Sequence, residues 1–123
     1  MRWSFVIDGK LPGANEFINA GYRNRFFANN MKKKAEGQVA EAIEKHGKPH
    51  FDKPVKIGFA WFEPNSRRDC DNVAFAKKFI QDALVRNGVL EDDSRKHVVG
   101  YLGEEFPVDK DFPHVVVTVT DEF

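Results

Sequence analysis

The apolar residues of this chain repeat with two different periods, and the order in which these periods alternate most restricts its fold. Over residues 54–62 every second side chain is a large apolar one, which is the pattern of a β-strand. Over residues 72–87 the apolar side chains recur every three or four positions, which is typical of a helix, and Gly88 follows as a helix terminator. Along the whole chain these periods predict strands at 2–7, 54–62, 96–106 and 114–121 and helices at 28–46 and 72–87.

This order of elements predicts an α+β fold, with two main helices packed on a mixed sheet of about four strands. A length of 123 residues suits one domain and is short for two, so we expect a single domain spanning residues 1–123. Both faces of the segment 54–62 are fairly apolar, which places this strand inside the sheet. Residues 11–15 are expected to form a loop.

The formal charges sum to zero, with 19 Lys and Arg against 19 Asp and Glu, but they are unevenly distributed. Residues 1–50 carry nine basic and five acidic groups, residues 51–100 carry nine and eight, and residues 101–123 carry one and six. The first hundred residues are therefore basic. The zero sum does not exclude a nucleic-acid partner, for which a basic surface is the usual sign.

The single cysteine, Cys70, excludes an internal disulfide and a zinc site built from several cysteines, which favours a reducing compartment. No run of apolar residues approaches the length of a membrane span. These features predict a cytoplasmic protein that does not associate with a membrane.

Two aspartates, Asp69 and Asp71, lie between the strand 54–62 and the helix 72–87. If this short segment is extended, carboxylates two residues apart point to the same side. Two carboxylates that close repel each other unless a cation joins them, and hard oxygen ligands favour Mg²⁺ or Mn²⁺. A third source of carboxylates, Glu91-Asp92-Asp93, follows the helix. A structural interpretation also fits, since Asp71 can cap the helix and residues 92–94 can form a turn.

Cations flank the first carboxylate pair on both sides. Arg67 and Arg68 precede it, and Lys77 and Lys78 lie on the helix that follows. Phosphodiester hydrolysis requires carboxylates that hold a divalent metal ion next to cations that hold the phosphate. The combination favours a metal-dependent nuclease.

Three motifs follow one another along the chain: Arg67-Arg68-Asp69-Cys70-Asp71-Asn72, Asp82-Ala83-Leu84 and Gly88-Val89-Leu90-Glu91-Asp92-Asp93-Ser94. In this order they resemble the RusA family of Holliday junction resolvases, which are homodimeric Mg²⁺-dependent endonucleases of bacteria and their prophages. A weaker match is Leu11-Pro12-Gly13-Ala14-Asn15, which is similar to the Leu-Pro-x-x-Asn loop of the family. The resemblance covers most of the chain, and the three motifs are specific in combination.

The resemblance implies that Asp69, Asp71 and Asp93 are the catalytic carboxylates and that they bind Mg²⁺, for which Mn²⁺ would substitute. It leaves open how many metal ions bind and whether Asp92 or Glu91 is a further ligand.

The resemblance also implies a functional lysine on the helix between the aspartates. The position four residues after Asp71 is Phe75, whereas counting back four residues from Asp82 gives Lys78, with Lys77 as the neighbouring alternative. The helix between Asp71 and Asp82 is three residues longer than in the best-known family member. Three residues are close to one helical turn, so Lys78 is expected to face the same way as the family's lysine. We therefore assign Lys78 as the catalytic lysine that stabilises the phosphate.

Other residues are candidates for contacts with DNA phosphates. Lys32 and Lys33 fall in the first turn of the helix 28–46, where the helix dipole disfavours cations, so their charge is expected to serve DNA binding. A merely solvated charged face is the alternative. The full set of DNA-binding candidates is Asn15, Arg23, Arg25, Lys32, Lys33, Arg67 and Arg68.

Phe26 and Phe27 lie between Arg25 and these lysines. Aromatic side chains in such a setting can stack on unpaired bases. The chain has 12 Phe and only four Leu, however, so packing in the core is the favoured expectation for both residues.

The favoured function is a structure-selective DNA endonuclease that resolves four-way junctions in recombination and repair. A homodimer is expected, because its two-fold symmetry matches the approximate symmetry of a junction that must be cut on two strands. Two alternatives remain: a non-catalytic nucleic-acid-binding or regulatory domain, and a nuclease for flaps and other branched DNA.

Overall fold

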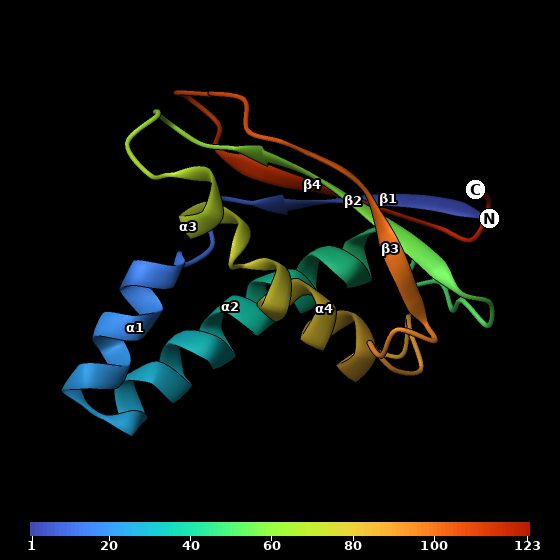
Figure 1. The fold of residues 1–123 in the computed structure, drawn as a ribbon, viewed down its shortest axis with the longest axis horizontal. Helices are drawn as coiled ribbons and strands as arrows, with labels where there is room; N and C mark the ends of the chain where they lie inside the picture. The colour runs from blue at the N-terminus through green and yellow to red at the C-terminus, as the bar shows by residue number, and fades with distance from the viewer.

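The computed structural model describes residues 1–123 as one four-stranded sheet with helices on one of its faces (Figure 1). The strands are β1 (Arg2–Asp8), β2 (Val55–Phe62), β3 (Val98–Glu105) and β4 (His114–Thr120). The helices are α1 (Ala14–Arg23), α2 (Arg25–Lys45), α3 (Cys70–Ala74) and α4 (Lys77–Arg86). This arrangement confirms the predicted α+β fold.

The sheet has the strand order β1-β4-β2-β3 and is mixed, as predicted. β4 lies antiparallel between β1 and β2, with Val116 opposite Val6 on one side and Ala60 on the other. β2 and β3 are parallel, and α3 and α4 form the crossover between them. β2 is an internal strand, which confirms its predicted position.

The core lies between the sheet and the helices. Every second residue of β2 is buried against them, and Trp61 is 1% exposed. Val39 and Ile43 of α2 and Ile80 and Leu84 of α4 belong to the same buried cluster. No helix covers the opposite face of the sheet (Figure 1). That face consists of the alternate, partly buried residues of the strands.

The structure adds a helix, α1, which the sequence patterns did not predict. It begins directly after Pro12-Gly13. The Glu16 carboxylate accepts a hydrogen bond from the Gly13 amide at 3.3 Å, so one of the amides left unpaired at the helix start has a partner. The side chain of Asn24 then accepts a bond from the Phe27 amide at 3.0 Å and begins α2 at Arg25. The predicted loop at 11–15 is therefore correct only as far as Gly13.

The earlier start of α2 overturns one argument about its lysines. Lys32 and Lys33 lie in the third turn of α2 and not in the first. The helix dipole acts mainly on the terminal turns, so it does not disfavour these cations. Their role must be judged from their neighbours.

The helix predicted at 72–87 is divided into α3 and α4 at Phe75 and Ala76, so the prediction of a continuous helix is wrong. The amides of Ala76 and Lys78 bond to carbonyls three residues back, which tightens the chain at this point. The ring of Phe75 packs against Phe17 of α1 and Phe79 of α4, with centroid distances of 5.6 and 5.7 Å. Packing against α1 stabilises this break, and the orientation of Lys78 does not follow from counting helical turns.

None of the helices, including α2 with its 21 residues, combines the length and the apolar character that crossing a membrane requires.

Candidate functional site

Asp69 and Asp71 lie at the start of α3, directly after the loop that leaves β2, and both are exposed. Asp69 is the N-cap residue, but its side chain makes no capping bond. Asp71 is already helical, and its Oδ1 atom accepts a bond from the Asn72 amide at 2.9 Å. The premise of an extended segment is therefore wrong. Asp71 lies inside α3 and is therefore not its N-cap, in contrast to the capping interpretation, and the carboxylate of Asp69 makes no hydrogen bond or ion pair.

Asn72 connects this segment to the first loop of the chain. Its Oδ1 atom accepts a bond from the Asn15 amide at 2.9 Å. A Cβ atom at Gly13 would lie 2.6 Å from the same oxygen, so only glycine permits this close approach. Two motifs that are far apart in the sequence thus meet in space. Asn15 takes part through its backbone, and its side chain is exposed in the first turn of α1.

The guanidinium of Arg68 is occupied by protein groups. Its Nε and Nη2 atoms donate to the two carboxylate oxygens of Glu63, both at 2.8 Å. Its Nη1 atom donates to Glu16 at 3.0 Å and to the Leu11 carbonyl at 3.2 Å. The bonds to Glu63 raise the pKa of Arg68 above its ordinary value. Arg68 therefore ties α1 and the first loop to the end of β2 with most of its N–H donors. Its contact with a DNA phosphate stays a prediction.

Arg67 differs from its neighbour. Its side chain is exposed and forms no ion pair, and only its amide is held, by Asn65 at 3.0 Å. Of the two arginines, Arg67 is the one with a guanidinium available to a DNA phosphate.

Lys78 and Asp93 lie close to each other. The Nζ atom of Lys78, in the first turn of α4, is 3.1 Å from Oδ1 of Asp82 and 3.9 Å from Oδ2 of Asp93. The hydrogen bond with Asp82 raises the pKa of Lys78 above its ordinary value. The loop after α4 thus brings Asp93 back beside this helix, near Asp82. Spacing alone did not show this return.

Asp92 is the neighbouring candidate ligand. Its Oδ1 atom accepts a bond from the Asp93 amide at 2.8 Å. This bond is the main reason that the pKa of Asp92 lies below its ordinary value. Asp92 shapes the turn, and the carboxylate of Asp93 is the one that points to Lys78.

Lys77 has other contacts. Its Nζ atom lies 2.5 Å from Glu104 of β3 and 4.8 Å from the ring centroid of Tyr101. Glu104 also accepts a bond from the Trp61 indole at 2.9 Å. Lys77 therefore supports the packing of α4 on the sheet. The geometry favours Lys78 over Lys77 as the lysine next to a candidate metal ligand.

A chain of ion pairs extends from Lys78 to α2. Asp82 is 3.8 Å from Lys32, and Lys32 is 4.0 Å from Glu36. Glu36 in turn lies 3.4 Å from Arg86. An open hollow of about 480 Å³ lies beside these residues and is lined by Lys32, Asp82, Val85, Arg86 and Asp93. The hollow combines two cations with a candidate metal ligand, and Lys32 is the only predicted phosphate contact that borders it.

No group of three or more His, Cys, Asp or Glu side chains is close enough together to hold a metal ion. Asp93 is paired with Lys78, and the structure does not gather Asp69, Asp71 and Asp93 into one ligand set. The three carboxylates still suit Mg²⁺ by their chemistry, because they are accessible hard oxygen donors.

The remaining candidates lie at the corner between α1 and α2. Arg23 ends α1 and Arg25 begins α2, and both are exposed. Lys33 is exposed on α2 and forms no ion pair. These residues are accessible to a phosphate, but they are not the residues that line the hollow beside Asp93.

Sequence reasoning did not single out Glu16, Glu36, Glu63 and Asp82 as partners of these cations. Two of these contacts could have been found from the sequence. Lys32 with Glu36 and Lys78 with Asp82 are pairs of opposite charge four residues apart on a helix. The contacts of Arg68 could not, because they depend on how a loop folds.

A comparison of the chain with protein-family models and with curated proteins finds no match. Its function is therefore inferred from its residues and their geometry.

Glu36 provides a test of the ion-pair chain. Its carboxylate is 6% exposed, and neither oxygen has a hydrogen-bond partner. A buried carboxylate without hydrogen bonds is costly, and apolar replacements of buried ionic groups are often stabilising. We expect Glu36→Met to raise the free energy of unfolding by about 1 kcal/mol, measured by urea denaturation.

The matched control is Glu41→Met, at an exposed position of the same helix, which is expected to change stability by less than about 0.5 kcal/mol. A clear loss of stability in Glu36→Met would show that the pairs with Lys32 and Arg86 outweigh the cost of burial.

Proposed function

We propose that this protein is a Mg²⁺-dependent, structure-selective DNA endonuclease that resolves four-way junctions. The observation that carries the proposal is the approach of Lys78 to Asp93 beside a hollow that also presents Lys32 and Arg86. Hydrolysis of a phosphodiester needs a carboxylate for the metal ion and cations for the phosphate in one place. The ordered motifs that resemble the RusA family support the same reading.

In the proposed mechanism Asp69, Asp71 and Asp93 would hold the metal. Mg²⁺ bound there would supply a Lewis acid and a water molecule of lowered pKa. Lys78 neutralises charge on the phosphate that is attacked, and its bond to Asp82 orients the Lys78 ammonium. Lys32 and Arg86 contribute positive potential at the same hollow, which favours the approach of a DNA backbone. A DNA substrate of this kind would place the protein in the cytoplasm.

A homodimer is part of the proposal, because a junction is resolved by two cuts that an approximate two-fold axis relates. The uncovered face of the sheet offers a surface for the second subunit. Val6, Val116 and Ala60 lie side by side across β1, β4 and β2 on that face, and all three are only partly buried. We expect the partner to dock there, since partly exposed apolar rows of this kind mark association surfaces.

Replacing Ala60 by glutamate tests this surface. We expect Ala60→Glu to shift the protein from dimer to monomer in sedimentation velocity, because each interface would then bury two uncompensated carboxylates. Gly37→Glu on α2 is the control, since a Cβ atom there has nothing within 4 Å. A wild-type monomer would contradict the homodimer, whereas an unchanged dimer in Ala60→Glu would move the interface to another surface.

The proposed activity is tested with purified wild-type protein on synthetic DNA. A four-way junction, a flap, a three-way junction and a linear duplex are incubated with Mg²⁺, Mn²⁺ or Ca²⁺ at one fixed salt concentration. We expect symmetric cuts in the four-way junction with Mg²⁺ or Mn²⁺ and slower cutting of the other substrates.

Each alternative gives a different result in this panel. A flap cut faster than the junction would point to a nuclease for other branched DNA. Tight junction binding with no cleavage under any metal ion would point to a non-catalytic binding or regulatory domain and would overturn the proposed activity. Crystals soaked with Mn²⁺ offer an independent check, because metal density next to Asp69, Asp71 or Asp93 is expected.

A further inference from the structure

The corner between α1 and α2 exposes three aromatic side chains. Tyr22 is 84% exposed, Phe26 is 68% and Phe27 is 43%. The expected core packing of Phe26 and Phe27 is therefore wrong, because the corner extends away from the sheet, at the lower left of Figure 1. Several large aromatic residues exposed together mark an interaction surface.

The charge around these rings has one sign. Residues 17–35 contain Arg23, Arg25, Lys32, Lys33 and Lys34 and no Asp or Glu. Among these five cations only Lys32 forms an ion pair. The guanidinium of Arg23 lies 4.7 Å from the ring centroid of Phe27, so cation and ring face each other directly. The partner of this surface is therefore expected to be anionic.

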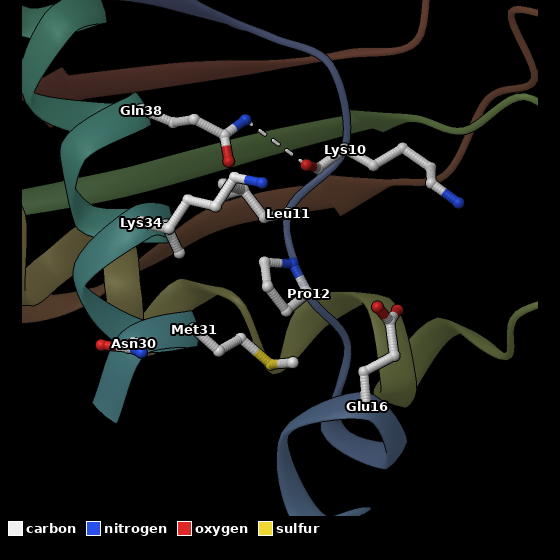
Figure 2. Close-up of a pocket in the computed structure, with 9 residues that line it drawn as sticks. Lys10, Leu11, Pro12, Glu16, Asn30, Met31, Lys34 and Gln38 are labelled. Carbon is white, nitrogen blue, oxygen red and sulfur yellow. Dashed lines mark hydrogen bonds between the residues drawn. The ribbon is translucent and has the colours of Figure 1, made fainter. Parts of the chain in front are cut away.

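A groove runs from this corner along the inner side of the hairpin. Two adjoining hollows, of about 370 and 330 Å³, share Glu16 and Met31 in their walls. The first lies between α2 and residues 10–12, where Figure 2 shows Leu11, Pro12, Met31 and Lys34 around the gap. The second continues to Arg23 and Phe27. Each hollow has the size of a small organic ligand such as a nucleotide.

The lining of the groove combines apolar walls with polar groups above them. Its only acidic residue, Glu16, is neutralised by Arg68 at 3.0 Å. Lys34 forms no ion pair and lies over the apolar residues in Figure 2. The Gln38 amide donates to the carbonyls of Asp8 and Lys10, at 3.3 and 3.5 Å, which fixes the loop that closes the upper end. These hydrogen bonds fix the shape of the groove, and its lysine and arginine side chains give it a positive charge.

We propose that the α1–α2 hairpin binds unpaired nucleotides of a single DNA strand. Phe27 in the wall of the groove, with Tyr22 and Phe26 on the exposed corner beyond it, stacks on the bases. Arg23 and Lys34 hold the phosphates of the strand as it passes from the corner into the groove. Aromatic platforms beside a positive groove are the common means of binding single strands, because every base has a flat face. The inference deepens the proposed function, on which it rests, by naming the part of a branched substrate that the hairpin takes.

The test uses the full chain and a fluorescent oligothymidine of about ten nucleotides, a length within the usual site size of such proteins. We expect wild-type protein to bind this strand more tightly than a duplex of equal length. The variant Tyr22→Ala/Phe26→Ala should weaken binding by roughly tenfold or more, since stacking on aromatic rings contributes strongly per base. Lys34→Gln should also weaken binding. The slope of log affinity against log salt concentration should fall by about one, because one fewer counterion is released from the strand.

Matched controls are available elsewhere on the surface. Phe112→Ala removes a ring that is 76% exposed in the loop before β4, and Lys110→Gln removes an exposed cation from the same loop. Neither change should alter binding to the single strand. Because Tyr22 and Phe26 are so exposed, their variant should keep the wild-type melting temperature within a few degrees.

The outcomes separate this inference from the proposed function. Junction cleavage by wild type with unchanged single-strand binding in Tyr22→Ala/Phe26→Ala would overturn the inference and leave the nuclease intact. Single-strand binding that depends on the two rings, without any cleavage, would support the hairpin and contradict the nuclease. If the rings govern only binding to anionic vesicles or only dimer formation, the surface belongs to a membrane or to a second copy, and the inference is wrong.

Discussion

Replacing Asp71 by asparagine should abolish Mg²⁺-dependent cleavage of a synthetic four-way junction while leaving junction binding close to the wild-type level. Asp71 is exposed, and the only hydrogen bond to its carboxylate comes from the neighbouring Asn72 amide, a bond that an asparagine side chain can also accept. The substitution therefore removes a charge without removing a structural contact. Loss of a metal ligand weakens a stabilisation of several kcal/mol, so the rate should fall by more than about a hundredfold.

Cleavage should be followed under single-turnover conditions with Mg²⁺, and binding should be measured with Ca²⁺ at the same salt concentration. Glu41→Gln is the matched control, because it also converts an exposed carboxylate to an amide and affects only a surface pair with Lys45. Equal cleavage rates in Asp71→Asn and wild type would remove Asp71 from the mechanism. A fall in binding that equals the fall in rate would give Asp71 a structural role instead.

Replacing Arg68 by glutamine should lower the free energy of unfolding by about 2–4 kcal/mol, because it leaves Glu63 without its partner. The side chains of Arg68 and Glu63 are 15% and 12% exposed, so water compensates little for the lost pair. The same change removes the bonds to Glu16 and to the Leu11 carbonyl, which hold α1 and the first loop. Urea denaturation measures this loss of stability. The dependence of the free energy of unfolding on urea concentration should be the same in the variant and in wild type.

Arg67→Gln is the control for this prediction, since its side chain is exposed and forms no ion pair. It should change stability by less than about 0.5 kcal/mol while weakening DNA binding. Adding Glu63→Gln to Arg68→Gln should restore part of the lost stability, because no buried charge then remains unpaired. If Arg68→Gln instead keeps full stability and loses DNA binding, the originally predicted phosphate contact is correct.

β2, β4 and α2 could be predicted from the sequence because their apolar residues recur at regular intervals. In β2 the large side chains alternate without interruption, and the structure buries these same residues. The first helix was missed, although its apolar and polar residues separate onto two faces at helical spacing. It begins at a Pro-Gly pair typical of a turn, and its start depends on the Glu16 carboxylate and on the contact of Asn72 with Asn15.

Non-local packing also limited the prediction of the second helical segment. Its apolar stripe is continuous in the sequence, but Phe17, far away along the chain, packs on Phe75 where α3 ends and α4 begins. A single-sequence pattern contains no information on such a contact. The same limit applies to Phe26 and Phe27, whose exposure follows from the position of the α1–α2 corner.

The candidate site was predictable in part. The spacing of Lys78 and Asp82 on one helix face follows from the helical repeat, and the structure pairs them. That Asp93 reaches Lys78 depends on the course of the loop after α4. The electrostatic role of Arg68 was least predictable, because a charge counted in a sequence says nothing about the carboxylate that compensates it.

The central position of β4 has a consequence for how the chain acquires its fold. β4 is the last strand in the sequence, yet β1 and β2 both depend on it for their antiparallel partner. During synthesis the backbone groups of β1 and β2 that bond to β4 therefore stay unpaired until residues 114–120 have left the ribosome. Pairings between such distant segments also make folding slow. A nascent or shortened chain that lacks this last strand should be a substrate for chaperones and prone to aggregate.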